Sequence, residues 1–341
     1  MDYTKTFDSD AYAKSNYLKA EEDILNILRH LLTSLGYTQQ HVHNYVYARG
    51  DTTVYLALVD DIEQLNNTGV RDLLGQLTKN DIIITDNFIH RPTLAKICKL
   101  PNSWFGVYHY EPDFYTDKPD RFFSYKARRL DNKRLELFLE IATKLENFDN
   151  GYVSLDCYYH NQPENGDSPV EYCFRDINHE SKSRYYEKFQ ELKDQFPYSN
   201  HSIDIDEVMQ RSLINVVIET YRSDYTVAFS EKTFRALVTP RLWTLYSGRF
   251  SCKVLEQLGF DILGDIVDHQ KYDVYTQKDR KVIDFVAHAN PNLIDIKWND
   301  VKDRCNKAAK HNIALLAEYK KQWPHDFAEW LPNVVATLTE G

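Results

Sequence analysis

The stretch FSEKTFRALV, residues 229–238, places charge where a buried strand gives way to a helix. Ser230, Glu231 and Lys232 occupy the junction, and Arg235 follows one helical turn later. The first N–H groups of a helix lack intrahelical partners and carry partial positive charge that suits phosphate. Lys232 could add a full positive charge, and Glu231 could accept hydrogen bonds from ribose hydroxyls. We therefore expect an anion site here; the alternative is a capped, solvated helix start.

A second segment, YKARRLDNKRLELF (125–138), has the same arrangement of a strand, a basic turn and a helix. Arg128 and Arg129 fall in the turn, and Lys133 and Arg134 enter the helix. This pattern predicts diphosphate binding across two strand ends, with a basic, solvated helix start as the alternative. Because both segments lie at strand ends of one expected domain, together they favour a nucleotide diphosphate site.

Carboxylates for acid–base chemistry are expected at strand ends of the first domain, facing the cleft. GVYHYEPDF offers Glu111 and Asp113, and IIITDNFIHR offers Asp86 and His90. One of these carboxylates could deprotonate an acceptor hydroxyl. The alternative for each is a structural role.

The sequence lacks the standard nucleotide-binding motifs GxGxxG and GxxxxGK[ST], so charged side chains would have to replace glycine-rich loops. Asp204 and Asp206 form a DxD that could hold a divalent metal, although Asp206 also fits a helix N-cap. His41 and His43 could form a metal pair or could be ordinary surface or core histidines. We predict no metal.

The formal net charge of −10 excludes a protein that coats nucleic acid non-specifically. Positive charge is nevertheless concentrated locally. Residues 118–134 hold seven Lys or Arg against two Asp, and residues 231–253 hold five against one acid. Two basic segments on an acidic background indicate anionic ligands.

Five scattered cysteines without a CxxC indicate reduced thiols, with neither a disulfide framework nor a zinc site. The N-terminal MDYTKTFDSD is acidic and polar, unlike a signal peptide. No apolar run reaches the roughly 20 residues needed for a membrane span. We expect a cytoplasmic protein with no membrane span.

Strand and helix patterns alternate along the chain, which predicts an α/β protein with largely parallel sheets. The Pro/Asp-rich stretch 112–121 marks a domain boundary. We expect domains at 1–118 and 119–298, followed by a helical tail at 299–341 that could pack back on the first domain. The expected strands are 44–48, 53–59, 81–86, 103–110, 121–126, 212–220, 225–229, 241–247 and 262–267. The expected helices are 10–35, 60–77, 91–100, 131–148, 183–195, 231–238, 251–260, 283–289 and 299–338, with a loop-rich stretch at 158–182.

The run from VVIETYRSDY to LEQLGFDIL, residues 216–263, resembles the donor-binding segment of nucleotide-sugar glycosyltransferases with the GT-B architecture. That architecture comprises two Rossmann-like domains. The likeness extends upstream to an arginine element and downstream to a D…YD continuation. The residues that carry it are Arg128, Arg129, Arg134, Glu219, Thr220, Ser230, Glu231, Lys232, Thr233, Leu255, Leu258, Gly259, Phe260, Asp261, Asp268, Tyr272 and Asp273.

The resemblance implies that Glu231 and Lys232 bind the ribose and diphosphate of a sugar donor, with help from Arg128, as in α-1,3-fucosyltransferases. The first 120 residues are loosely similar in topology to the first domain of phage DNA β-glucosyltransferase. In that enzyme an acidic residue at a strand end is the base, which would fall near Glu111 here.

The implied activity is hexosyl or pentosyl transfer from a UDP-sugar to a hydroxyl, such as that of 5-hydroxymethylcytosine in double-stranded bacteriophage DNA. Enzymes of that kind include glucosyl- and arabinosyltransferases. The alternatives are a glycosyltransferase acting on a cell-surface glycan or protein, and a non-catalytic nucleic-acid-binding accessory protein.

Overall fold

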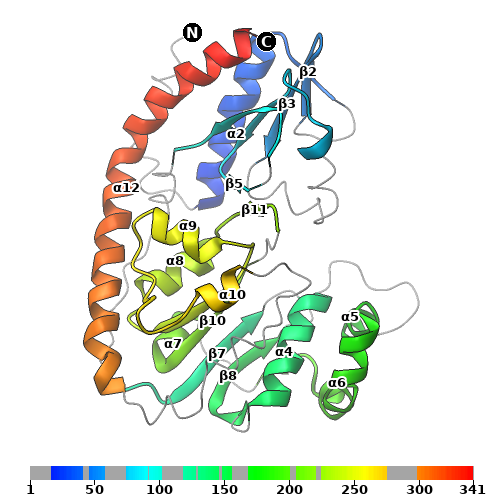
Figure 1. Ribbon diagram of the computed structural model, residues 1–341, viewed down its shortest axis with the longest axis vertical. Coiled ribbons are helices and arrows are strands. Elements are labelled where there is room, and N and C mark those ends of the chain that lie inside the picture. The colour runs from blue at the N-terminus through cyan, green and yellow to red at the C-terminus, as the bar shows by residue number, and fades with distance from the viewer. Residues whose placement is uncertain are drawn as a thin grey trace.

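Two five-stranded sheets organise the computed structural model, one in each half of the molecule (Figure 1). The structure describes residues 17–40, 46–57, 74–90, 92–101, 118–127, 130–145, 148–155, 168–199, 205–219, 224–274 and 298–340. We call residues 17–101 the first half and residues 118–274 the second half. The protein is α/β with mixed parallel and antiparallel pairing and a long C-terminal helix, in agreement with the predicted fold class at that level.

The first half is built around β4, an apolar run that is buried along its whole length. The sheet order is β1-β2-β3-β4-β6, with β3, β4 and β6 parallel and β1 and β2 antiparallel. Helix α2 buries Ile24, Leu28 and Leu32, which recur at the helical spacing of one apolar face. The elements are α2 (Tyr17–Ser34), β1 (Thr38–Gln39), β2 (Val46–Arg49), β3 (Thr52–Ala57), β4 (Ile82–Thr85), β5 (Phe88–Ile89) and β6 (Lys96–Lys99).

The second half has the sheet order β12-β10-β7-β8-β9, in which the first four strands are parallel and β9 is antiparallel. Every residue of the central strand β10 is buried, as expected for a strand covered on both faces. The elements are β7 (Arg121–Ala127), α4 (Asn132–Lys144), η4 (Phe148–Asn150), β8 (Gly151–Leu155), α5 (Pro169–Arg175), α6 (His179–Leu192), η5 (Lys193–Gln195), β9 (Tyr198–Ser199), α7 (Ile205–Arg211), β10 (Ser212–Ile218), β11 (Thr226–Val227), α8 (Glu231–Val238), β12 (Leu242–Tyr246), α9 (Ser251–Gln257) and α10 (Gln270–Asp273).

Helix α12 (Trp298–Glu340) runs along one side of the molecule from the second half to the first (Figure 1). Its beginning packs on the second half, where the Arg241 guanidinium lies 4.1 Å from the Trp298 ring centroid. Near its end, the Leu338 carbonyl accepts hydrogen bonds from the Tyr37 hydroxyl at 2.9 Å and from Arg49 at 3.0 Å. These bonds satisfy a carbonyl that the helix itself leaves unpaired. Helix α12 therefore contacts both halves.

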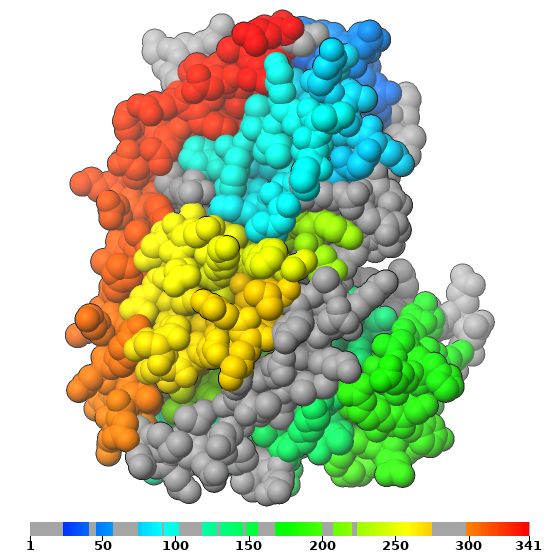
Figure 2. All heavy atoms as spheres, viewed as in Figure 1, coloured from blue at the N-terminus to red at the C-terminus, as the bar shows by residue number. Residues whose placement is uncertain are grey.

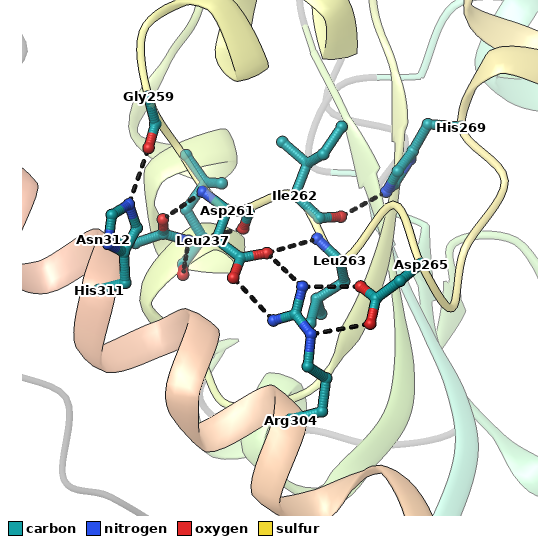
Figure 3. A network of polar contacts seen from close by, with 10 residues as sticks. All are labelled: Leu237, Gly259, Asp261, Ile262, Leu263, Asp265, His269, Arg304, His311 and Asn312. Carbon is teal, nitrogen blue, oxygen red and sulfur yellow. Dashed lines mark hydrogen bonds and ion pairs between the residues drawn. The ribbon is translucent and has the colours of Figure 1, made fainter.

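A polar network fixes the middle of α12 to the second half (Figure 3). The Arg304 guanidinium makes two hydrogen bonds of 2.7 Å with Asp261 and bonds of 2.7 and 2.9 Å with Asp265. The Asn312 side-chain amide donates to the carbonyls of Leu237 and Asp261 and accepts from the Asp261 N–H at 2.8 Å. Hydrogen bonding to Arg304 lowers the pKa of Asp261 and Asp265 against the opposing effect of burial. Both carboxylates thus remain charged partners of the helix.

The carboxyl ends of the two parallel sheets face each other. In the chain, β5 follows the end of β4 and β11 follows the end of β10. Strands β5 and β11 pair antiparallel, with Phe88 opposite Val227 and Ile89 opposite Thr226. The ladder continues at His90, whose N–H donates to the Tyr225 carbonyl at 2.7 Å. Figure 1 shows this short ladder between the two sheets. Ligands in open α/β sheets bind outside the carboxyl ends of strands, so this junction is where a site is expected.

Three expected elements differ from the structure. The stretch 91–100 was predicted as a helix, but Lys96–Lys99 forms β6, which extends the sheet beside β4. The run 262–267 forms turns rather than a strand, and part of the loop-rich stretch 158–182 is helix α5. The expected strand 103–110 and helix 283–289 lie outside the described residues.

Candidate ligand site at the facing sheet edges

The Glu219 carboxylate holds the start of α8 in place. Glu219 follows β10, is completely buried and accepts the Ser230 N–H at 2.9 Å. It also accepts the hydroxyls of Ser230 and Thr233. The structure therefore brings together three residues that the sequence predicted at the donor site. These side-chain bonds from Ser230 and Thr233 to Glu219 fix the strand-to-helix junction.

The N-terminus of α4 is capped by an internal carboxylate. Asp131 accepts the N–H groups of Lys133 and Arg134 at 3.0 and 2.8 Å, in the manner of an N-cap. The Arg134 side chain is buried, and its Nε lies 3.6 Å from Asp131. The sequence placed Arg134 on a diphosphate, whereas in this structure it is packed inside the protein beside its cap. Its expected neighbours Arg128 and Arg129 lie outside the described residues.

The same device recurs at α9. The Asp273 carboxylate is buried and accepts the N–H groups of Cys252 and Lys253 at 3.0 and 3.1 Å, although it lies 21 and 20 residues further along the chain. At α8 the Ser230 hydroxyl accepts the Lys232 N–H at 3.4 Å while it donates to Glu219. Protein carboxylates thus already lie at the starts of α4, α8 and α9. A phosphate at this edge must be bound mainly by cationic side chains.

Such cations are present on α8. Lys232 and Arg235 are half-buried, and both lie on the helix that begins at the carboxyl edge. Glu231 is half-buried in the same first turn. All three side chains are partly exposed. The predicted helix 231–238 is confirmed; Glu231 and Lys232 lie in its first turn and Arg235 in its last.

The first half contributes a buried carboxylate beside a lysine. Asp86 follows β4, is buried, and accepts a hydrogen bond from the Asn87 amide at 3.0 Å. Lys99 ends the neighbouring strand β6, and its ammonium lies 3.8 Å from the Phe88 ring centroid. Burial lowers the pKa of Lys99 to about 8, while the charge of Asp86 opposes this shift. Asp86 and Lys99 thus place a carboxylate and an ammonium near each other at the edge.

Lys99 was missed because residues 91–100 were expected to form a helix. The sequence signal for a strand is the short stretch TLAKICKL (93–100), which contains Ile97 and is bounded by Pro92 and Pro101. A strand beginning after Pro92 would be parallel to β4 and would place Lys99 at the same end as Asp86. The other expected acid–base residues, Glu111 and Asp113, lie outside the described residues.

The two edges are in direct contact. The ring of His90 packs edge-on against Phe250 with a centroid distance of 5.4 Å. Figure 2 shows the corresponding surface, where the segment that includes α9 and α10 (yellow) is pressed against the segment that includes β4–β6 (cyan). The candidate site is therefore formed by both halves.

Within the described ranges, no group of three or more His, Cys, Asp or Glu is arranged to hold a metal ion. Among the same residues, no helix combines the length and hydropathy needed to cross a bilayer. Asp204, His41 and His43 lie outside the described residues.

Comparisons of the chain with protein-family profiles, with curated protein sequences and with solved structures find no match.

Proposed function

We propose that the protein is a nucleotide-sugar glycosyltransferase with a GT-B arrangement, its donor bound by residues 119–298 and its acceptor by residues 1–118. The observation that carries this proposal is the meeting of two parallel-sheet carboxyl edges at the β5–β11 ladder. A transferase needs two substrates side by side, and each edge offers one binding face. The resemblance of residues 216–263 to donor-binding segments supports the same assignment.

The donor diphosphate would be bound by Lys232 and Arg235, and the ribose hydroxyls by Glu231. These side chains are half-buried on α8, Glu231 and Lys232 in its first turn and Arg235 in its last, while Glu219 fixes the start of the helix. The positive charges would stabilise the UDP that leaves as the glycosidic bond to phosphate breaks.

On the facing edge, Asp86 would accept the proton of the acceptor hydroxyl as its oxygen attacks the anomeric carbon. Lys99 would hold this carboxylate in its charged form, because an ammonium nearby favours the carboxylate over the acid. The new carbon–oxygen bond forms on the acceptor, the bond to the diphosphate breaks, and the proton passes to Asp86.

For the acceptor we propose 5-hydroxymethylcytosine in double-stranded bacteriophage DNA, modified in the host cytoplasm. The base would have to be turned out of the duplex to bring its hydroxyl to Asp86. The local concentration of positive charge within an acidic chain is compatible with a DNA backbone bound at one face.

The test is transfer itself. The full chain is incubated with UDP-glucose, UDP-arabinose or GDP-sugars and with duplex DNA that contains either 5-hydroxymethylcytosine or cytosine. Mass spectrometry should find a mass increase of one sugar on the hydroxymethylated duplex only. Thermal shift with UDP and GDP gives an independent readout of donor binding. If neither nucleotide raises the melting temperature and no sugar is transferred to any acceptor, the glycosyltransferase proposal is wrong.

A further inference from the structure

The loop between β12 and α9, residues 247–250, contains two buried polar atoms that have no hydrogen-bond partner among the described residues. Ser247 is completely buried, and among the described residues its hydroxyl has no hydrogen-bond partner. The same holds for Nε of Arg249 within the part of the chain that is described. Buried polar groups in folded proteins are nearly always paired, so each exception calls for an explanation. Two of the ten such atoms in the described residues lie in this one four-residue loop.

The loop is held in one shape by its own hydrogen bonds. Phe250 has φ 65°, a left-handed conformation that is uncommon for a residue other than glycine. Its N–H donates to the Asp273 carbonyl at 2.8 Å, and its carbonyl accepts the Val254 N–H at 2.9 Å. The Ser251 N–H and hydroxyl both bond the Gly248 carbonyl. Strained backbone persists only where its surroundings enforce it, and such residues cluster at ligand sites.

The loop lies at the meeting point of the two edges. It begins directly after Tyr246, whose carbonyl accepts the Glu219 N–H at 2.9 Å, so it starts beside the end of β10. At its far end His90 of the first half packs against Phe250. The loop is therefore adjacent to the proposed donor edge and is contacted by the acceptor half.

The charge of the loop suits an anion. The Arg249 guanidinium lies 4.6 Å from the Phe250 ring centroid, and Lys253 follows in the first turn of α9. Desolvation lowers the pKa of His90, and the charges of Arg249 and Lys253 act in the same direction, against a hydrogen bond with the Arg249 backbone. The acid at this position, Asp273, already accepts two N–H groups of α9. A planar guanidinium fits phosphate oxygens well.

We propose that the β12–α9 loop is a phosphate subsite, in which the Arg249 guanidinium and the Ser247 hydroxyl donate hydrogen bonds to the sugar-linked phosphate of the donor. This inference rests on the proposed function. It adds Ser247 and Arg249 to a donor site that otherwise consists of side chains on α8. It assigns the diphosphate, rather than the base or the sugar, to the position where the two halves touch.

The test is calorimetric titration of the full chain with UDP, UMP and inorganic pyrophosphate. Arg249→Gln should weaken UDP and pyrophosphate binding about 10- to 100-fold, since a hydrogen bond from a charged group is lost. UMP, which lacks the second phosphate, should lose less. Ser247→Ala should act in the same direction with a smaller effect. Lys271→Gln is the matched control, because Lys271 is an exposed cation of the same half and should leave all three affinities unchanged.

The outcomes separate the two proposals. If the wild-type chain binds UDP and Arg249→Gln binds it equally well, the subsite is disproved and the donor site stands. If pyrophosphate binds through Arg249 but no sugar nucleotide binds or reacts, the subsite stands and the glycosyltransferase proposal fails. Should Arg249→Gln fold poorly by circular dichroism, Arg249→Lys is measured instead. It keeps the charge but loses the planar fork, and UDP affinity unchanged from wild type would again disprove the subsite.

Discussion

The two facing edges hold their central carboxylates by different means. Among the described residues, Glu219 accepts hydrogen bonds from neutral donors alone, an amide N–H and two hydroxyls, and none of these changes charge near neutral pH. Asp86 lies near Lys99, an ammonium whose pKa burial lowers to about 8. The second-half edge is thus a fixed scaffold, whereas the first-half edge carries a charge that changes within an accessible pH range. Under the proposed function, the Glu219 contacts on the donor side are insensitive to pH near neutrality, whereas the acceptor side responds to pH.

The largest expected effect is a loss of folding stability when Glu219 is replaced. Glu219→Ala leaves three buried donors without an acceptor and should lower the free energy of unfolding by about 3–5 kcal/mol. Urea unfolding followed by circular dichroism measures this loss. Glu231→Ala removes a half-buried carboxylate 12 residues later and should cost under about 1 kcal/mol. Equal losses in the two variants would show that Glu219 is no more structural than Glu231.

Acid should weaken the second half. His269 is buried and its pKa is lowered by burial to about 4; one ring nitrogen bonds the Ile262 carbonyl and the other the Tyr272 hydroxyl. Between pH 6.5 and 4 the unfolded chain binds a proton that the folded chain does not, so stability falls as pH falls through this window. The loss should reach about 3 kcal/mol near pH 4. Unfolding midpoints at pH 7, 6, 5 and 4 measure it, and His269→Gln should have a flatter profile than the wild type.

Lys232 should be needed for donor binding but not for folding. Lys232→Ala should weaken UDP-sugar binding by about 10- to 100-fold, the value of one hydrogen bond from a charged group. Its melting temperature should stay close to that of the wild type, because the side chain is only half-buried. Titration calorimetry and transfer rates are compared with Lys271→Ala, which removes an exposed charge from the same half. Near-normal turnover in Lys232→Ala would remove α8 from the donor site.

The smallest expected effect is on turnover and involves Lys99 at the first-half edge. As pH rises above about 8, Lys99 loses its charge and ceases to support Asp86, so turnover should decline. Lys99→Met should be slower at pH 7 by roughly fivefold, corresponding to about 1 kcal/mol, and should lack that alkaline decline.

Stability provides the second readout of Lys99. Its lowered pKa means that the unfolded chain holds an extra proton between about pH 8 and 10.5, so the wild type should gain stability relative to Lys99→Met as pH rises there. If turnover and stability depend on pH identically in the wild type and in Lys99→Met, Lys99 does not make the first-half edge responsive to pH.

Local signals in the sequence predicted where two helices of the second half begin. The helix 231–238 begins at the expected residue because Ser230 is a good N-cap and an apolar strand precedes it. Residues 132–144 likewise follow the N-cap Asp131. In both cases the deciding contacts are within a few residues, where sequence patterns are informative.

Distant contacts were not predictable in the same way. The cap of α9 comes from Asp273, about 20 residues beyond the amides that it binds, and no spacing rule links them. Residues 91–100 were expected to form a helix, and the apolar Leu94 and Ile97 in this stretch are exposed. The pairing of Lys96–Lys99 with β4 decided the outcome there. Tertiary pairing thus overrode local preference at the edge that supplies Lys99.

Helix α12 also has a mechanical property. It is attached to the second half through residues 298–319 and to the first half at Leu338, and at 1.5 Å per residue it is about 65 Å long. Pro324 lies between these attachments, and Pro332 follows it. Each proline lacks the N–H that would bond the preceding turn, which makes a helix easier to bend at that point. The same segment buries Trp323, Phe327, Leu331 and Val334, so a bend at these prolines would have to carry a packed apolar face with it.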